Sequence, residues 1–369
     1  MNTGLRRRMA IGNLAGVRRG SALAATAAAA FALAFGLGAL ILRPAAAGAG
    51  GAASAAANGL CDSYAGVPQG SLRHAGMAQI QGGHFMMGSD EHYAEEALAH
   101  EVQIHSFWID QHDVTNAQFE RFIVATGYVT VAERVPDIQR HPDLPPQMRV
   151  PGSVVFVMGE KGRSGRWRYV AGANWRHPQG PDSSISDRPA HPVVHIAYED
   201  AEAYARWSGR DLPTEAQWEH AARGGLQGQP YVWGSEFTPG GKPMANTWQG
   251  PFPLVNTGED GHSRNFRCWL LSRQWLWAVR HGGQCLAVDG HLVSQRPCGQ
   301  PEDNPIGPNE LDSFDPRQPG TPAKVIKGGS HLCAANYCMR YRPAARQARE
   351  TDSGTSHIGF RTVLNERAS

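Results

Sequence analysis

No helical periodicity is found after Gly225 in this chain of 369 residues. Glycine, proline and aromatic residues dominate that part of the sequence, and apolar residues do not recur there at the spacing of a helix face. This pattern predicts long ordered loops over a small sheet. Such an arrangement often uses bound ions in place of regular hydrogen-bonded structure.

Signals for a hairpin and a helix precede this region. Glycines flank a short apolar run at residues 82–89, which we expect to pair as a strand with residues 102–109. Residues 115–118 read Thr-Asn-Ala-Gln, the form of a capping box, and apolar residues then recur on one face until Gly127. The sequence therefore predicts a hairpin followed by a short amphipathic helix.

Two further helices are predicted close together. One spans residues 199–207, with Ala203, Tyr204 and Trp207 facing inward, and a glycine soon after it ends the helix. The next begins at a second capping box, residues 214–217, and continues to a pair of glycines. Helical structure is expected to end there.

The N-terminal segment has the pattern of an export signal. Residues 1–20 are basic, and the uncharged residues 21–42 are long enough to cross a bilayer as a helix. A cleaved signal peptide and a signal anchor both remain open, because small residues follow at a position that suits a signal peptidase. Residues 43–75 are rich in Ala and Gly and predict a flexible linker.

This N-terminal pattern predicts where the chain is located. We expect residues 1–20 to stay in the cytoplasm and the rest to be extracytoplasmic, either periplasmic or secreted. The protein would contact the inner membrane through residues 21–42 if the signal is retained. One large domain is expected over residues 76–366, because the first seventy residues cannot contribute a packed core. We expect the protein to be a monomer.

Charge gives no sign of a nucleic-acid partner. The formal net charge is +2, and charged residues are scattered along the chain rather than gathered in runs. A nucleic-acid binder would instead carry a long positive patch or stripe. We therefore expect no nucleic acid among the partners.

Several long phrases between residues 76 and 364 resemble the formylglycine-generating enzyme family, also called sulfatase-modifying factors. A specific one is Gly-Gly-Ser-His-Leu-Cys at residues 328–333, followed by a second cysteine, Cys338. The resemblance implies an α+β, C-type-lectin-like fold that is loop-rich, with little regular secondary structure. The other matching phrases lie at residues 172–178, 212–219, 245–250, 256–261 and 359–361.

This resemblance implies an oxidase that converts a sulfatase cysteine to formylglycine. Two cysteines of the family hold Cu(I), and Cys333 and Cys338 match them here; soft thiolates suit that ion and leave it open to a third thiolate and to dioxygen. The substrate cysteine would lie in a Cys-x-Pro-x-Arg motif that the sulfatase presents as an extended peptide. Dioxygen would be the co-substrate.

Further site residues are implied by the same resemblance. Ser330 matches a serine that lines the family's active pocket, and Tyr337 and Arg346 match positions near it. Trp175 and Arg176 are expected to shape the cleft that binds the substrate. Each of them could equally be a satisfied structural residue.

Calcium is the second ion that the resemblance implies. Asn246 and Asp260 match side-chain ligands, while Thr247 and His262 match positions where the family donates a backbone carbonyl. Oxygen-rich loops of this kind supply the carboxylate, amide and carbonyl ligands that calcium prefers. The alternative is that Asp260 simply caps a turn.

Residues 262–303 depart from the family. Where the family reads Gly-Tyr-Gly-Leu-Tyr-Asp-Met-Ala-Gly-Asn-Val-Trp, this chain reads Trp-Leu-Trp-Ala-Val-Arg-His-Gly-Gly-Gln-Cys-Leu at residues 275–286. Possible codons for residues 279–286 can be read in the frame that starts at the second base of each codon. In that frame they can encode Tyr-Asp-Met-Ala-Gly-Asn-Val-Trp. We hypothesise that this region is translated from a shifted frame; a lineage-specific insertion or loop replacement is the alternative.

Other functions stay open for the cysteine pair. The four residues between Cys333 and Cys338 fit neither a zinc knuckle nor a thioredoxin motif, but a local disulfide or a thiol–disulfide protein remains an alternative. A noncatalytic lectin-like binding module, or an inactive relative of the family, is the alternative outside redox chemistry. Catalytically silent paralogues of the family lack both thiols, so the presence of both cysteines in this chain favours the enzyme.

Overall fold

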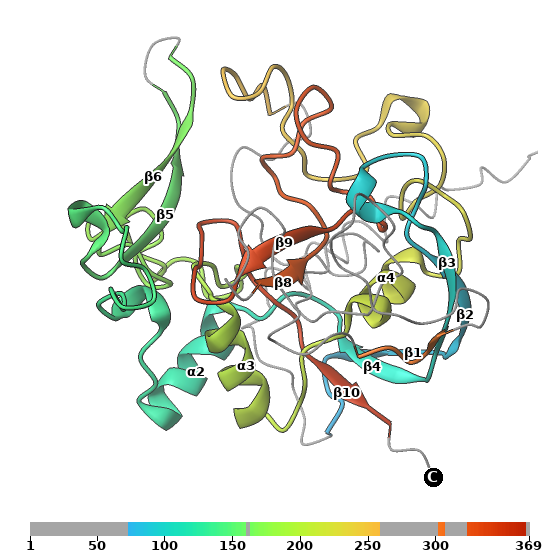
Figure 1. The fold of residues 1–369 in the computed structure, drawn as a ribbon, viewed down its shortest axis with the longest axis horizontal. Coiled ribbons are helices and arrows are strands. Elements are labelled where there is room, and N and C mark those ends of the chain that lie inside the picture. Colours follow the sequence, from blue (N-terminus) through green and yellow to red (C-terminus); the bar gives the residue numbers. More distant parts are fainter. Residues whose placement is uncertain (1–72, 160–162, 259–301, 307–322, 367–369) are drawn as a thin grey trace, which may run out of the picture. The chain divides into compact units, whose positions relative to one another are not determined.

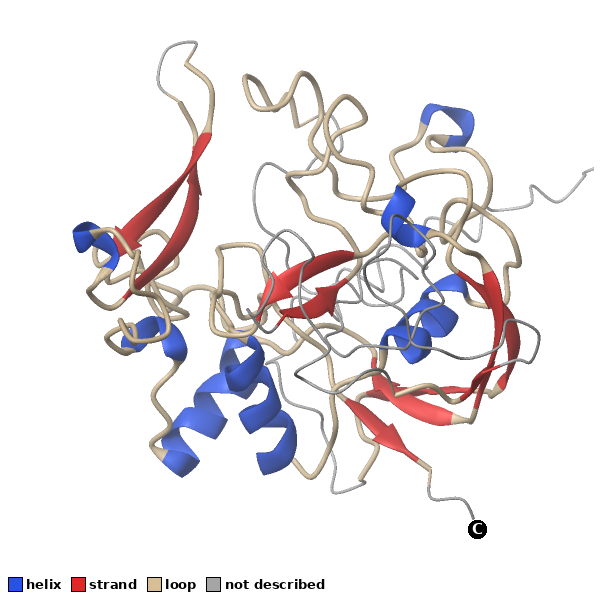
Figure 2. Ribbon diagram, viewed as in Figure 1, coloured by secondary structure: helices blue, strands red, loops and turns tan. Residues whose placement is uncertain are grey.

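The computed structural model describes residues 73–159, 163–258, 302–306 and 323–366. Loops and turns make up most of this part of the chain (Figure 2). The α+β class and the loop-rich character predicted from the sequence are therefore confirmed. The strands are β1 (Met77–Ile80), β2 (Gly83–Met87), β3 (His100–Ile104), β4 (Phe107–Asp110), β5 (Gly152–Val157), β6 (Arg166–Ala171), β7 (Glu302–Asp303), β8 (Ala323–Ile326), β9 (Gln347–Glu350) and β10 (Val363–Asn365); the α-helices are α2 (Asn116–Thr126), α3 (Tyr198–Trp207) and α4 (Glu215–Arg223).

Four small sheets, rather than the single small sheet expected, are formed by the described strands (Figure 1). One has the order β1-β4-β10 and another β2-β3-β7, in which β3 and β7 are parallel. The other two are the antiparallel pairs β5-β6 and β8-β9. Sheets this small leave the long loops between them to carry most of the surface.

The predicted hairpin is present, but its second strand is shorter than expected. Strand β2 pairs antiparallel with β3, as predicted, whereas residues 105–106 break the expected strand 102–109, and β4 joins β1 and β10 instead. Val102 and Ile104 are buried, and so are Phe107 and Ile109. Because the buried positions change from even to odd numbers, a single straight strand cannot bury all four side chains.

Both predicted capping boxes form. At α2, the Thr115 hydroxyl accepts a hydrogen bond from the Gln118 amide at 3.3 Å, and the Gln118 side chain accepts one from the Thr115 amide at 2.8 Å. Thr214 and Gln217 repeat this exchange at α4. A glycine with positive φ ends each helix, as the sequence indicated.

The α3 helix starts one residue before the predicted position and ends at the predicted one. Tyr204 is buried, as expected, and Ala203 is partly buried. The inward orientation expected for Trp207 is wrong, because this side chain is 42% exposed. Trp207 is the last residue of the helix. One side of its ring contacts Phe122, with 5.6 Å between the ring centroids, and the remainder of the ring is exposed to solvent.

Two apolar clusters hold these elements together. The first packs α4 against β2, β3 and β4, and the second packs α2 against α3, which lie side by side (Figure 2). Between β8 and β9 the chain makes a long loop that contains both candidate cysteines. Large side chains of the first cluster are Phe85, Phe107 and Trp218, and those of the second are Phe119, Trp175, Tyr204 and Phe360.

Several predictions lie outside the described residues. They include the basic segment 1–20, the apolar segment 21–42 and nearly all of the linker 43–75. The anomalous segment 262–303 is also outside, apart from the two residues of β7. Within the described part of the chain, no helix has both the length and the hydropathy needed to span a bilayer.

Candidate active site around Cys333 and Cys338

The loop after β8 brings the two cysteines together through tight turns. Gly329 has a φ of +70°, and a Cβ there would lie 2.7 Å from the backbone nitrogen of Tyr341, so glycine is required. The Cys333 amide donates to the Ser330 carbonyl at 2.8 Å, and the Cys338 amide donates to the Ala334 carbonyl at 2.9 Å. These successive turns place the two side chains within hydrogen-bonding distance of each other.

Cys333 and Cys338 are both free thiols, and they differ in ionisation. The hydrogen bond from Cys333 lowers the pKa of Cys338 to about 7, against the effect of burial; the backbone N–H of Arg340 and nearby arginine charges lower it further. Donating that bond, together with burial, raises the pKa of Cys333 well above its usual range. Near neutral pH Cys333 is therefore a thiol, and Cys338 is partly ionised to a thiolate.

A cavity of about 400 Å³ borders both thiols and three of the other predicted site residues. The Ser330 hydroxyl accepts a hydrogen bond from the Leu332 amide at 3.0 Å. Tyr337 is 61% exposed and stacks on Phe252 at 4.1 Å between ring centroids. The predicted residues that line this cavity are Ser330, Cys333, Tyr337, Cys338 and Arg346.

A buried ion network, which no local sequence pattern indicates, supports the base of this cavity. The ammonium of Lys327 lies 3.3 Å from Glu215 and 3.0 Å from Glu219, and none of these three side chains reaches solvent. Arg346 pairs with Glu215 at 2.7 Å and Arg223 with Glu219 at 2.7 Å. Helix α4 is thus tied by charge to both ends of the loop that carries the cysteines.

A second group of ion pairs holds the other side of the loop. Arg340 lies 2.6 Å from Glu95, and its guanidinium stacks on the ring of Tyr93. Arg342 donates to Glu96 at 2.6 Å, and both side chains are buried. Sequence reasoning missed these two glutamates, because nothing near them in the chain points to partners about 245 residues away.

Trp175 and Arg176 are not at the cysteine cavity. Trp175 is fully buried in the second apolar cluster, edge-to-face with Phe119. Arg176 stacks on Trp175 and pairs with Glu133 at 2.8 Å. Their assignment to substrate binding stays a prediction that the cavity does not support.

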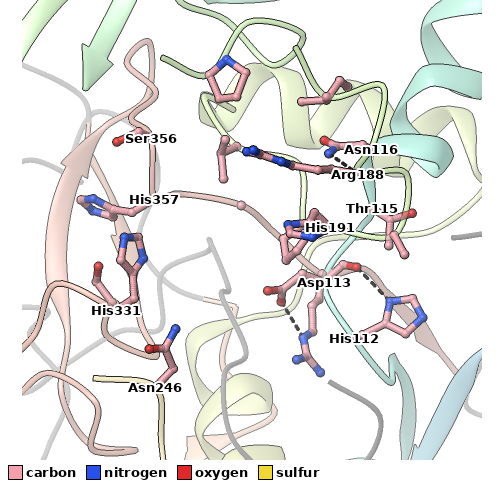
Figure 3. Close-up of a pocket in the computed structure, with 18 of the residues that line it drawn as sticks. His112, Asp113, Thr115, Asn116, Arg188, His191, Asn246, His331, Ser356 and His357 are labelled. Atoms are coloured by element: carbon pink, nitrogen blue, oxygen red, sulfur yellow. Dashed lines mark hydrogen bonds and ion pairs between the residues drawn. The ribbon is translucent and has the colours of Figure 1, made fainter. Parts of the chain in front are cut away.

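A smaller cavity, of about 130 Å³, meets the first at Ser330 and is lined by several histidines (Figure 3). His331 and His357 lie on one side of it and His191 and Asp113 on the other. Asp113 pairs with Arg361 at 2.8 Å. Among the described residues, no three His, Cys, Asp or Glu side chains are arranged to hold a metal ion.

The described residues include both proposed copper ligands and two of the four proposed calcium ligands. Two adjacent thiols, one with a pKa of about 7, are a soft ligand pair that suits Cu(I). For calcium, Asn246 is buried, but its atom without a partner among the described residues is the donor Nδ2 and not the oxygen that calcium would need; the Thr247 carbonyl accepts a bond from Gln249 at 3.1 Å. Asp260 and His262 lie outside the described residues.

Comparison with known proteins gives consistent matches. The family model for the sulfatase-modifying factor enzyme 1-like domain matches residues 65–266 and 302–366, which leaves 267–301 unmatched. The formylglycine-generating enzyme of Mycobacterium tuberculosis is 44% identical over 299 residues, covering 78% of this chain and 97% of that protein.

Two other relatives extend the comparison. The mouse protein called inactive C-alpha-formylglycine-generating enzyme 2 is 31% identical over 324 residues, covering 80% of this chain and 88% of its own. The solved structure of PvdO from Pseudomonas aeruginosa has a TM-score of 0.50 and 17% identity, covering 82% of this chain and 98% of PvdO. At that identity the likeness to PvdO concerns the fold alone.

Proposed function

The chain belongs to the sulfatase-modifying factor family, and on that basis we propose that it is a copper-dependent formylglycine-generating oxidase. One observation carries the proposal: Cys333 and Cys338 are free, hydrogen-bonded to each other, and border one cavity. Family membership alone would not distinguish an enzyme from an inactive relative, since the similar proteins include one named as the enzyme and one named as inactive. The thiol pair is what makes the oxidase the better reading.

The substrate is proposed to be a cysteine of a sulfatase, within a Cys-x-Pro-x-Arg motif bound in extended form. Removal of one hydrogen from its sulfur and one from its β-carbon gives a thioaldehyde, and dioxygen takes up these two hydrogens with their two electrons, a reduction to the level of hydrogen peroxide. Water then hydrolyses the thioaldehyde to the aldehyde and releases hydrogen sulfide. Cu(I) bound by the two cysteines would supply a soft centre for thiol and dioxygen.

The residues of the chain prepare this site. Cys338 is already about half ionised near pH 7, and the charges of Arg340 and Arg342 favour its thiolate. Cys333 is the group that must lose a proton from Sγ when both thiols become ligands. Since Ser330 accepts a bond from a backbone amide, its own hydroxyl proton is left to donate into the cavity.

Other parts of the proposal rest on the sequence. We place the reaction outside the cytoplasm, because residues 21–42 follow a basic segment as in an export signal. Calcium is proposed as a structural ion held by Asn246, Thr247, Asp260 and His262, because side-chain and backbone oxygens of this kind are the ligands that calcium prefers. The active form is proposed to be a monomer.

Copper titration of the full chain tests the ligand pair. We expect one Cu(I) per chain, lost in both Cys333→Ser and Cys338→Ser and retained in the control Cys61→Ser, which replaces a cysteine of the predicted linker. Oxygen uptake with a cysteine peptide should then require copper. Copper binding that survives both substitutions would overturn the ligand set, and bound copper without oxygen uptake would favour the noncatalytic binding module.

A further inference from the structure

One face of the β8–β9 pair forms a wall of the cysteine cavity. In the antiparallel register, Lys324 is opposite Arg349 and Ile326 is opposite Gln347, so these four side chains share one face. Ile326, Gln347 and Arg349 all line the cavity. The two strands are adjacent in the middle of Figure 1.

Arg349 differs from the other cations that line this cavity in having no ion-pair partner among the described residues. Lys327, Arg340 and Arg346 also line it, and each pairs with a glutamate. Arg349 forms no ion pair with any described residue, and its Nε atom is buried without a hydrogen-bond partner. Glu350 follows it on the strand and points to the opposite face of the ladder; its charge raises the pKa of Arg349, but by less than burial lowers it.

The surroundings make this charge costly in the free protein. Burial lowers the pKa of Arg349, which reports an unfavourable environment for the guanidinium. Lys324 stands directly opposite on the same face, so the residue across the ladder supplies no counter-charge. Among the described residues that line the cavity, none is an aspartate or glutamate, and the partly ionised Cys338 is the one acidic group. A ligand with negative charge would relieve this imbalance.

The Thr355 hydroxyl adds a second polar group to the same wall. Thr355 lines the cavity, and its Oγ1 atom is buried without a hydrogen-bond partner among the described residues. An arginine and a hydroxyl together offer donors to an oxygen anion, and a carboxylate accepts several such bonds at once. Both residues line the same cavity.

We propose that Arg349 is a specificity-determining residue that favours a substrate peptide with an Asp or Glu side chain near the target cysteine. This inference rests on the proposed function, because it assigns a partner to the cavity that binds the cysteine peptide. A compact cavity of about 400 Å³ is roughly 9 Å across, the length of about three extended residues. The carboxylate therefore belongs within three residues of the cysteine.

A peptide series tests this directly. Each peptide carries the same Cys-x-Pro-x-Arg motif and an amidated C-terminus, which removes the terminal carboxylate, and one variable position near the cysteine holds Asp or Asn. Binding to the full chain is measured by fluorescence anisotropy and conversion by mass spectrometry. We expect one Asp peptide to bind about tenfold or more tightly than its Asn partner.

Substitutions assign the preference to the arginine. Arg349→Gln should abolish the Asp preference, Arg349→Lys should keep part of it, and Arg349→Glu should reverse it toward a Lys peptide. The control Arg121→Gln removes an exposed cation of α2 and should leave the preference intact. Thermal melting of each variant shows that it is folded.

The outcomes separate this inference from the proposed function. Conversion of Asp and Asn peptides with equal affinity and rate overturns the inference and leaves the oxidase standing. A preference that survives Arg349→Gln overturns the role of Arg349. Peptides that bind without any conversion overturn the oxidase, and the absence of binding by every peptide overturns both.

Discussion

Removing the Cys333 side chain should raise the pKa of its neighbour, Cys338. The hydrogen bond from Cys333 is the largest cause of the lowered pKa, which is about 7 instead of the ordinary 9.0. Cys333→Ala deletes that donor, whereas Cys333→Ser replaces it with a hydroxyl that can still donate. The pKa of Cys338 is expected to move toward 9 in the alanine variant and to remain lower in the serine variant.

The size of the effect follows from the two pKa values. At pH 7 about half of the Cys338 side chains are thiolate when the pKa is 7, against roughly 1% when it is 9, a ratio of about 50. A thiolate of higher pKa is intrinsically more nucleophilic, by about eightfold over two pKa units. Alkylation of Cys338 at pH 7 should therefore slow by only about sixfold in the alanine variant, while its pH midpoint rises.

Alkylation followed by mass spectrometry measures this in metal-free protein. Trypsin cleavage after Lys327 and Arg340 releases one peptide that carries both cysteines, and fragmentation distinguishes Cys338 from Cys333. The pH midpoint should lie near 7 in the native chain and closer to 9 in Cys333→Ala. A native midpoint near 9, or one that does not respond to the alanine substitution, would refute the coupling of the two thiols.

Four further substitutions test how the fold and the site are supported. Lys327→Met should lower the free energy of unfolding in urea by about 3–5 kcal/mol, because it leaves Glu215 and Glu219 buried with less compensation; an unchanged stability would refute the importance of that network. Trp218→Ala should cost about 3–5 kcal/mol by the same assay, and Trp207→Ala no more than about 2 kcal/mol, since Trp207 is partly exposed. Chelation of calcium should lower the Tm of the native chain but not that of Asn246→Ala; equal losses would argue against Asn246 as a ligand.

Local signals in the sequence predicted local structure well. The capping boxes at Thr115 and Thr214 depend on contacts between residues three apart, and both form as expected. The break in the strand after Ile104 was missed, although the change in parity of the apolar residues could have revealed it. The inward orientation expected for Trp207 failed because apolar spacing does not show where the core ends.

The residues of the candidate site were likewise predicted where the signal is local and missed where it depends on distant parts of the chain. Residues between Ser330 and Arg346 were found because they are close in sequence and match one family motif, and the fold brings them to one cavity. Their charged supports, Glu96 and Glu215, are more than 100 residues away from their partners, so only the tertiary structure reveals them. Arg349 escaped notice because an arginine in a strand carries no signal until the structure shows its buried Nε atom without a hydrogen-bond partner among the described residues.

The most direct test of the account is mass spectrometry of a Cys-x-Pro-x-Arg peptide after incubation with the full chain, Cu(I) and dioxygen. The account predicts loss of the thiol and gain of an aldehyde with the native chain, and no change with Cys333→Ala or Cys338→Ala. A second protein, with residues 262–303 translated in the shifted frame, shows whether that segment limits the reaction. Absence of the aldehyde from both proteins, with copper bound, would contradict the oxidase and leave a binding module as the function.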